Sequence, residues 1–587
     1  MLAQIPLATL AALLLVGADR APSMKFPAPA HATTIASTTL STTSPKTAST
    51  TSQSAVLTNA PAQQLNKAAP AMNSPSTERS ATTQTAPAET RLPVWVYFQE
   101  LRTQPCQVCE TPITDLAVAR RTQRRTLPGV VDIHDMPLPQ ECANAITATG
   151  ATVRVQSRWL NAISALATPV QITALQKLPQ VLRVEHVRRG RSIARDEMST
   201  AAPLTQFTDD TDIYGNAALQ VDQIDVRRLH NAGYRGKGII IGILDSGFHR
   251  VHEAFHSVEH PLQVIAEWDF VKNDNNTDIQ TGDYATQHKH GTWILGTMAA
   301  YLPNQMVGTA YQARFVLAKT ENVASETSIE EDFYVAGLEF VEAHGADVAT
   351  SSLGYIIWYT QADMNGVTAV TTKAVNIATA NGLVCLTAAG NSGYDTNPAT
   401  NTLVAPADAM QVLTCGAVNS AGGIANFSSS GPSADGRVKP EILALGEFTS
   451  TINSTATTGL STLNGTSLST PLLAGAVACV LQARPDFTVD SLRTALFATA
   501  SQSDASGAHS DPLFVTGYGI MQAFAASQFV TPCLGDLDGS RNVDSADVSM
   551  VLLDFGDCSG CAADLDHSGN VDSADVSLVL LSSGACQ

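Results

Sequence analysis

The chain has 587 residues, with 34 Lys and Arg against 53 Asp and Glu, a formal net charge of −19, and ten cysteines. This length is too great for one hydrophobic core, so we expect several domains. The acidic balance argues against nucleic acid as a partner, because neutralising phosphates requires clustered Lys and Arg.

The first 21 residues resemble a secretory signal peptide. An apolar run extends from Leu7 to Val16, interrupted by Thr9, but no Lys or Arg precedes it. The run is too short to span a membrane, and no later segment reaches about twenty uninterrupted apolar residues. We therefore predict a secreted or cell-surface protein with no integral membrane segment.

Residues 22–91 form a predicted spacer. From Ala21 to Thr90, 48 of 70 residues are Ser, Thr, Ala or Pro. Such a composition buries too little apolar surface to offset chain entropy, so we expect disorder in this segment.

Residues 92–200 have the pattern of a small folded domain. The segment holds three cysteines without a convincing His partner, so we predict no zinc site there. The alternation of apolar and polar residues predicts an α+β fold. The predicted strands are 94–98, 151–155, 161–167 and 181–187, and the predicted helix is 169–178.

Three short motifs further along the chain supply Asp245, His290 and Ser467, in that order. A Ser hydroxyl needs a base whose pKa lies near the working pH, and His supplies one. A carboxylate then holds the other ring nitrogen and stabilises the imidazolium. Asp245 follows the apolar run 239–244, which predicts a buried parallel strand with the site at its carboxyl end.

The predicted nucleophile stands at the start of a predicted helix. Ser467 follows a Gly-Thr turn and precedes the apolar segment Leu472–Leu481, with Pro471 expected in the first helical turn. The amino end of a helix favours developing negative charge.

Asn391 is the predicted side-chain donor to an oxyanion. It follows the predicted strand 382–386. A tetrahedral acyl-transfer intermediate carries an oxyanion, and a fixed side-chain amide is a suitable donor to it.

From about residue 92 to 525 the chain resembles the subtilase family of serine endopeptidases, peptidase S8. The order Asp, His, Ser is typical of that family, and segments such as Val307–Ala310 and Phe427–Pro432 extend the resemblance. It implies a subtilisin-like α/β catalytic domain at residues 201–528, with a parallel sheet flanked by helices, which hydrolyses peptide bonds of proteins through an acyl-enzyme.

The resemblance also implies how peptide substrates are held. The segment made of Ser351, Ser352, Leu353 and Gly354 is expected to pair with the substrate main chain. Because backbone hydrogen bonds tolerate many side chains, broad specificity is expected.

In this family, residues 92–200 correspond to a prodomain that acts as intramolecular chaperone and inhibitor and is then cleaved off. Residues 91–195 carry a net charge of +7 and residues 196–587 a net charge of −28. Opposite charges favour docking of the two parts. The basic segment Arg188–Arg191 is the predicted position of the maturation cut.

Two segments of 26 residues, Cys533–Cys558 and Cys561–Cys586, repeat almost word for word. Each has oxygen-bearing side chains at loop positions 1, 3, 5, 7, 9 and 12, the spacing that surrounds Ca²⁺ in an EF-hand-like loop. We predict a small all-α module at residues 533–587 that binds Ca²⁺. The predicted ligands are Asp536, Asp538, Ser540, Asn542, Asp544 and Asp547 in the first loop, and Asp564, Asp566, Ser568, Asn570, Asp572 and Asp575 in the second.

Position 12 of each loop is Asp instead of Glu, so the repeat resembles dockerin modules more than calmodulin-type hands. The first loop has Arg541 at position 6, where the second has Gly569, which predicts weaker binding at the first site. A cohesin-like or cell-surface partner is one hypothesis for this module, and a calcium-stabilised appendage with no partner is the other.

The remaining predictions concern cysteines. In an exported protein we expect the disulfides Cys533–Cys558 and Cys561–Cys586, with cross-pairing of these four residues as the alternative. Cys385, Cys415 and Cys479 lie in apolar segments and are predicted to be buried core residues.

The sequence thus predicts a secreted, self-processing zymogen. One alternative is a catalytically inert scaffold whose calcium module binds a surface or matrix partner. Another is an inhibitor of other subtilases that acts through its prodomain; that is the weaker alternative, because a prodomain does not need a complete triad.

Overall fold

A computed structural model describes residues 90–102, 113–187, 212–324, 327–503, 511–530, 535–540, 542–558, 561–566 and 568–585. The predicted signal peptide and the predicted spacer up to residue 89 lie outside this set. The predicted cut at Arg188–Arg191 also lies outside it.

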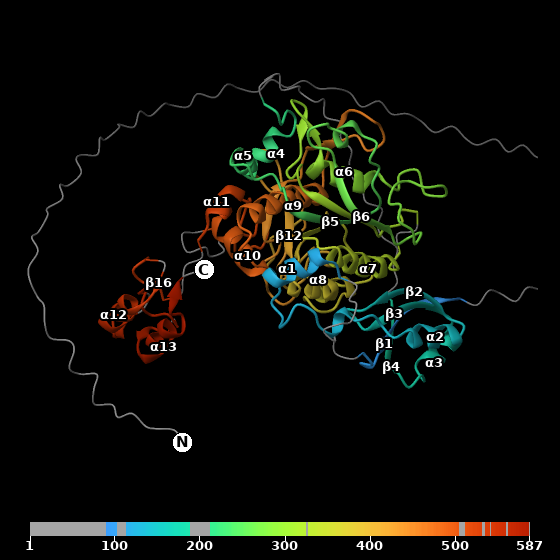
Figure 1. The fold of residues 1–587 in the computed structure, drawn as a ribbon, viewed down its shortest axis with the longest axis horizontal. Coiled ribbons are helices and arrows are strands. Elements are labelled where there is room, and N and C mark those ends of the chain that lie inside the picture. The colour runs from blue at the N-terminus through green and yellow to red at the C-terminus, as the bar shows by residue number, and fades with distance from the viewer. Residues whose placement is uncertain are drawn as a thin grey trace, which may run out of the picture. The chain divides into compact units, whose positions relative to one another are not determined.

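The predicted prodomain contains a four-stranded antiparallel sheet in the order β2-β3-β1-β4 (Figure 1). Val94 and Val96 of β1 face a core shared with α2 and α3, whereas Trp95 and Tyr97 face a second cluster that includes Phe333 of the larger domain. This confirms the α+β prediction. The elements are β1 (Leu92–Phe98), α1 (Asp115–Arg124), η1 (Ile133–Asp135), α2 (Gln140–Ala148), β2 (Thr152–Ser157), β3 (Ala162–Ala167), α3 (Pro169–Leu175) and β4 (Val181–His186).

The larger domain is built on seven parallel strands in the order β13-β12-β11-β10-β5-β9-β6. In β5, Ile241 and Ile243 belong to one apolar core and Ile240 and Leu244 to the core on the other face. A strand buried on both faces explains the continuous apolar run in the sequence. The strands are β5 (Ile240–Asp245), β6 (Gln263–Asp269), β9 (Arg314–Lys319), β10 (Val348–Ser351), β11 (Val384–Ala388), β12 (Leu413–Val418) and β13 (Ile442–Leu445).

Helices cover both faces of this sheet, which confirms the predicted subtilisin-like layers. Residues of α6 and α9 belong to one core and residues of α7 and α8 to the other. The helices are α4 (Ala218–Gln223), α5 (Val226–Asn231), α6 (Lys289–Ala299), α7 (Glu330–Ala343), α8 (Val370–Ala380), α9 (Thr466–Ala483), α10 (Val489–Thr499) and α11 (Ala523–Gln528); shorter elements are η2 (Glu253–Phe255), η3 (Gln361–Asp363), β7 (Tyr301–Leu302), β8 (Met306–Val307), β14 (Thr449–Ile452) and β15 (Leu460–Leu463).

Helix α9 begins earlier than the sequence predicts. It starts at Thr466, so Pro471 lies in its second turn and not in its first. Proline has no N–H, so the carbonyl of Ser467, four residues earlier, receives no helical hydrogen bond. The hydroxyl of Ser352 donates to that carbonyl at 2.9 Å.

Helix α9 is also the one helix in the described parts of the chain that is long and apolar enough to cross a membrane. In this protein 89% of its 18-residue apolar window is buried. It packs against the sheet as the central helix of the core.

The carboxyl-terminal module contains two helices, as expected for the predicted all-α module, and also short strands that join its two repeats. Strand β16 pairs with β19 and β17 with β18, so the end of the second repeat pairs with the loop of the first. One apolar core includes Val543, Val551, Val571 and Val579 from both repeats. The elements are β16 (Asn542–Val543), α12 (Ser545–Leu553), β17 (Gly556–Asp557), β18 (Asn570–Val571), α13 (Ser573–Leu581) and β19 (Gly584–Ala585).

The predicted disulfides that close each repeat are wrong. Cys558 is bonded to Cys561, which excludes Cys533–Cys558 and Cys561–Cys586 and agrees with the alternative, cross-pairing between the repeats. The two repeats fold around one core, so nothing requires each repeat to be closed separately. Cys385, Cys415 and Cys479 are buried free thiols as predicted, and Cys142 is also free, whereas Cys106 and Cys109 lie outside the described residues.

Candidate active site

Asp245 and His290 meet at the carboxyl edge of the sheet. Asp245 ends β5, and His290 lies in the first turn of α6. The Nδ1 atom of His290 lies 2.7 Å from Oδ1 and 2.9 Å from Oδ2 of Asp245. Both side chains are buried, and the amide of Ser246 donates to Asp245 Oδ1 at 2.7 Å. A side chain at Gly291 would overlap the carbonyl of Gly247, which explains the small residue after His290.

Ser467 is the second residue of α9 and is 4% exposed. Its Oγ lies 3.5 Å from the carbonyl of Ser352. Its amide belongs to the first turn, where helix amides have no acceptor within the helix. A nucleophile at this position therefore lies beside a backbone donor and the positive end of the helix dipole.

Asn391 follows β11 and is held by the residue before Ser467. The Thr466 amide donates to Asn391 Oδ1 at 2.9 Å, and the Thr466 hydroxyl donates to the same atom at 2.8 Å. Because Oδ1 accepts both bonds from Thr466, the Nδ2 donors of Asn391 point away from Thr466. Thr466 thus sets the orientation that an oxyanion donor needs.

Gln287, which the sequence analysis did not identify, connects the loops around the site. Its side-chain amide donates to the carbonyl of Ser246 at 2.7 Å and to the carbonyl of Glu321 at 2.6 Å. Its Oε1 accepts from the amide of Val323 at 3.2 Å. The side chain is 2% exposed, so these bonds tie the loop after Asp245 to the segment before α6.

Lys319 is a second residue that the sequence analysis missed. It ends β9, in register with Asp245 of β5. Its buried ammonium lies 2.8 Å from Asp269 and 3.0 Å from Asp283. The Lys272 ammonium lies 2.8 Å from Asp283, so two ammonium groups balance the two carboxylates, and the cluster anchors the loop that leads from β6 toward α6.

The predicted substrate-binding segment divides into two parts. Ser351 lies within the sheet and pairs in register with Leu244 on one side and Thr387 on the other. The chain then leaves the sheet, and Gly354 is exposed. Ser352, Leu353 and Gly354 are thus the part of the predicted segment that lies beyond β10.

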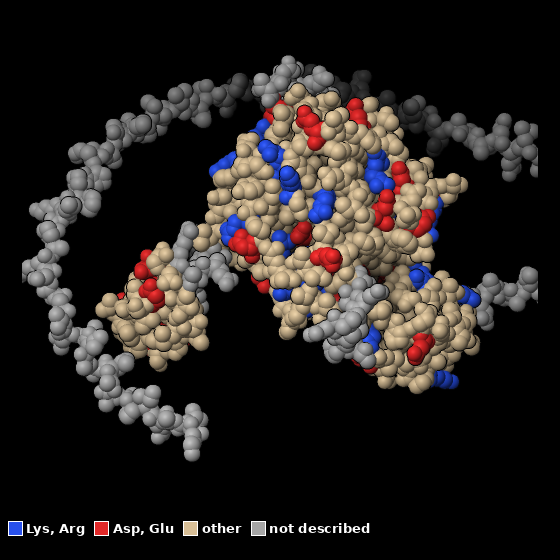
Figure 2. Space-filling model, viewed as in Figure 1, with Lys and Arg blue, Asp and Glu red and all other residues tan. Residues whose placement is uncertain are grey.

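Three carboxylates come together in each loop of the carboxyl-terminal module. The ligand atoms within each group lie within 4.8 Å of one another. Figure 2 shows acidic and no basic side chains on the visible face of this module. The groups are Asp536, Asp538 and Asp547, and Asp564, Asp566 and Asp575.

The other predicted ligands make contacts within their loops. The side chains of Asp544 and Asp572 cap α12 and α13 by accepting from backbone amides. The hydroxyl of Ser540 donates to the carbonyl of Asn542 at 3.1 Å, and that of Ser568 donates to the carbonyl of Asn570 at 3.0 Å. The carboxylates at loop positions 1, 3 and 12 thus lie together in each repeat, and their oxygen atoms are the kind of ligand that suits Ca²⁺.

Comparison with known proteins agrees with this fold. The model of the subtilase family matches residues 236–519, and that of the peptidase S8 propeptide domain of Bacteroidota matches residues 93–202. Subtilisin E of Bacillus subtilis (strain 168) is 30% identical over 388 residues, which are 66% of this chain and 85% of that protein. A subtilisin of Bacillus pumilus is 31% identical over 309 residues, which are 52% of this chain and 98% of that protein.

A solved structure shares the fold. Fervidolysin from Fervidobacterium pennivorans, described as a keratinolytic enzyme related to subtilisin, matches with a TM-score of 0.51 and 20% sequence identity. The match covers 76% of this chain and 62% of that one.

The parallel sheet flanked by helices and the match to the subtilase family model define a serine peptidase of the subtilisin type. The chain belongs to the subtilase family. It is a serine endopeptidase made as a zymogen, with a propeptide domain ahead of its catalytic domain.

Proposed function

We propose that Ser467 is the nucleophile, His290 its general base and Asp245 the group that orients His290. Asn391 and the Ser467 amide are the proposed oxyanion donors. The observation that carries this proposal is the contact of His290 Nδ1 with buried Asp245 at 2.7 Å. A carboxylate on Nδ1 keeps the proton there and leaves Nε2 as the basic atom.

The reaction follows from these positions. Ser467 Oγ forms a bond to the carbonyl carbon of the scissile peptide while its proton passes to His290 Nε2. Asn391 Nδ2 and the Ser467 amide donate to the oxyanion of the tetrahedral intermediate. The C–N bond then breaks, His290 protonates the leaving amine, and water repeats these steps to hydrolyse the acyl-enzyme.

Protein and peptide substrates are expected to lie along Ser352, Leu353 and Gly354, whose backbone continues beyond the sheet. The proposed catalytic domain spans residues 201–528. Residues 92–200 are proposed to fold with it and to inhibit it until they are cut off and removed, and residues 1–21 to direct export from the cell.

Calcium is the proposed cofactor of the module at residues 533–587. Asp536, Asp538 and Asp547 would hold one ion and Asp564, Asp566 and Asp575 the other, with the backbone carbonyl of loop position 7 as a further oxygen. A bound ion would neutralise three clustered carboxylates and hold each loop closed.

A docking role for the same module is a second candidate. Leu553 and Leu581 stand at equivalent positions of α12 and α13, and each is 84% exposed. Paired exposed leucines favour a cohesin-like or cell-surface partner. Loss of binding to a cell-envelope fraction in the variant carrying Leu553→Lys and Leu581→Lys would support it, and unchanged binding would contradict it.

The catalytic proposal is tested by activity and labelling together. The full-length chain in millimolar Ca²⁺ should lose its prodomain, degrade denatured casein and react with a fluorophosphonate at Ser467. The Ser467→Ala variant should do none of these. Casein hydrolysis by that variant, or labelling at a different residue, would exclude Ser467 as the nucleophile.

A further inference from the structure

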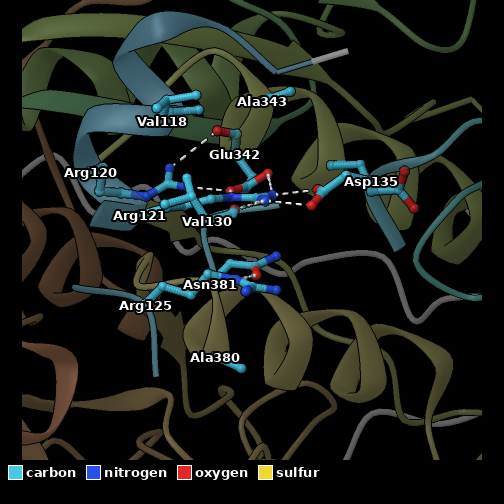
Figure 3. Close-up of polar contacts among 12 residues, drawn as sticks. Val118, Arg120, Arg121, Arg125, Val130, Asp135, Glu342, Ala343, Ala380 and Asn381 are labelled. Carbon is cyan, nitrogen blue, oxygen red and sulfur yellow. Dashed lines mark hydrogen bonds and ion pairs between the residues drawn. The ribbon is translucent and has the colours of Figure 1, made fainter. Parts of the chain in front are cut away.

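Helix α1 of the prodomain lies across the carboxyl ends of two helices of the catalytic domain (Figure 3). The amide and hydroxyl of Thr114 both donate to the carbonyl of Ala343, the last residue of α7, at 2.9 Å. The amide of Thr126 donates to the carbonyl of Ala380, the last residue of α8, at 3.0 Å. The last carbonyls of a helix lack partners within it. The segment Thr114–Thr126, here called the docking helix, supplies hydrogen-bond donors to these carbonyls of both α7 and α8.

Arginines of the docking helix also place positive charge at the capped carboxyl end of α7. Arg120 donates to the carbonyls of Glu342 and Ala346 at 3.1 and 2.7 Å and forms an ion pair with the Glu342 side chain. Cations are stabilising at a helix carboxyl end, where the helix dipole is negative. Arg120 is 3% exposed, so solvent screens these contacts weakly.

Arg121 joins the two parts of the chain through a buried charge cluster (Figure 3). It contacts both carboxylate oxygens of Asp135 in the prodomain, at 2.7 and 2.8 Å. It also contacts both carboxylate oxygens of Glu342 in the catalytic domain, at 2.7 and 2.8 Å. Bidentate pairs of this kind are specific in geometry, and removal of one partner leaves a buried charge uncompensated.

The catalytic domain also provides the space for this helix. Gly345 and Gly382 follow α7 and α8 and have φ of +84° and +83°. A side chain at Gly345 would overlap Leu116, and one at Gly382 would lie 2.7 Å from the backbone of Arg124. The surface at these two turns is therefore complementary in shape, as well as in charge, to the docking helix.

The contact is far from the reacting groups. Arg124 bonds to Asp347 at 2.7 Å, and Asp347 accepts from the amide of Ile240, the first residue of β5. Asp245 stands at the other end of the same strand, five residues away, a separation of about 16 Å at 3.3 Å per residue. A molecule bound at the active site would therefore leave the docking helix in place.

We propose that the docking helix is a second, independent attachment site of the prodomain, at the edge of the sheet opposite the active site. It keeps the cut prodomain bound to the enzyme while the active site is occupied by another molecule. The prodomain sheet has its own contact with α7 through Arg154 and Asp332. Two linked contacts give a much higher affinity than either alone.

The inference rests on the proposed function in one respect only: the enzyme must cleave the chain between its prodomain and its catalytic domain. The full-length chain is allowed to process, its Ser467 is blocked with a fluorophosphonate, and dissociation of the prodomain is followed by native mass spectrometry. The prodomain should stay bound to the blocked enzyme. In the Arg121→Met variant it should dissociate about a hundredfold or more faster, because Glu342 and Asp135 lose their shared partner.

Arg183→Met is the matched control, because Arg183 is exposed and pairs with Glu185 within the prodomain. This control should dissociate at the wild-type rate. Equal rates for Arg121→Met and wild type, or release of the wild-type prodomain when Ser467 is blocked, would overturn the proposal.

Hydrogen exchange on the wild-type complex covers the case in which Arg121→Met fails to fold. The amides of Thr114 and Thr126 should stay protected after Ser467 is blocked, and rapid exchange of both would overturn the proposal. If the chain neither labels nor processes, the catalytic proposal fails. The docking helix is then tested in Ser467→Ala protein cut by limited trypsin at Arg188–Arg191, with the same comparison of dissociation rates.

Discussion

Thr466 holds Asn391 through two hydrogen bonds to one atom, Oδ1, at 2.9 and 2.8 Å. The pair therefore couples the residue before the proposed nucleophile to the proposed oxyanion donor. Any change that frees Oδ1 lets the amide rotate, and its donors then lose the alignment on which oxyanion stabilisation depends.

The first prediction follows from this pair. Asn391→Ala should lower kcat by about a hundredfold to a thousandfold, the magnitude measured for loss of one such donor in a subtilisin, with little change in KM. Thr466→Val should have a smaller effect on kcat, because the backbone amide still donates to Oδ1. Both values come from hydrolysis of a chromogenic peptide, with active enzyme counted by fluorophosphonate titration. A change in KM alone for Asn391→Ala would assign it to substrate binding.

The second prediction concerns Gln287, which joins the loop after Asp245 to the segment before α6, the helix that carries His290. Gln287→Leu keeps the approximate volume but leaves the carbonyls of Ser246 and Glu321 without this donor. We expect a fall in kcat with KM nearly unchanged, together with a shift of the acid limb of the kcat–pH profile, since the geometry between Asp245 and His290 is disturbed.

Gln287→Glu serves as the second variant in this experiment. It retains the acceptor but replaces the donor, and should be impaired like Gln287→Leu. A lower thermal stability with normal kcat and a normal pH profile in both variants would show that Gln287 has only a structural role.

Asp245 and Ser467 could be predicted from sequence because each borders an apolar segment. The run before Asp245 is a buried strand, and the run after Ser467 is a buried helix. Parallel strands place their carboxyl ends at one edge of the sheet, so the position of Asp245 at the end of β5 could be predicted. The supporting contacts of Gln287 and Thr466 join residues that are distant in sequence, and no local pattern marks them.

Helix α1 was not predicted, for a related reason. Its sequence has few apolar residues, and Arg120, Arg121 and Arg124 are buried against carbonyls and carboxylates of the catalytic domain. Hydrophobic periodicity does not report a helix whose buried face is made of arginines. The disulfide prediction failed because it treated each repeat as a closed unit, whereas β16 and β19 join the two repeats.

The third prediction concerns pH and the prodomain. Asp332 is buried under the prodomain, and its desolvation raises its pKa to about 6 although Arg154 and Ser164 contact it. Burial also raises the pKa of Glu339, which bonds to Ser157 at 2.5 Å. A carboxyl whose pKa is higher in the complex takes up a proton on binding, so affinity rises as pH falls through this range.

Prodomain affinity should therefore increase about tenfold between pH 7.5 and pH 5 from Asp332 alone. Below the ordinary pKa of Glu the trend should reverse, since the pKa of Glu342 is lowered in the complex: burial opposes this shift, but Arg120 and Arg121 outweigh it. The pH dependence is measured as the rate at which the prodomain dissociates from enzyme blocked at Ser467. The Asp332→Asn variant is the control and should lose most of the pH dependence. Faster release at pH 5 than at pH 7.5 would contradict the assignment.

The fourth prediction concerns the two carboxylate clusters of the carboxyl-terminal module. Titration with Ca²⁺ should show two sites, and chelation should lower the thermal stability of the module, because three carboxylates within 4.8 Å repel one another without a cation. Calcium at a hundred times its Kd would stabilise a site by about 2.7 kcal/mol. Asp547→Asn should remove the first site and Asp575→Asn the second.

Asp557→Asn is the matched control, since it removes one exposed acidic charge of β17 that belongs to neither cluster. It should leave both sites intact. Arg541 lies outside the described residues, but its place at loop position 6 predicts that the first site is the weaker one and that Arg541→Gly strengthens it. A stoichiometry of two in Asp547→Asn, or equal loss in Asp557→Asn, would show that calcium binds elsewhere and that these carboxylates serve mainly to cap and close their loops.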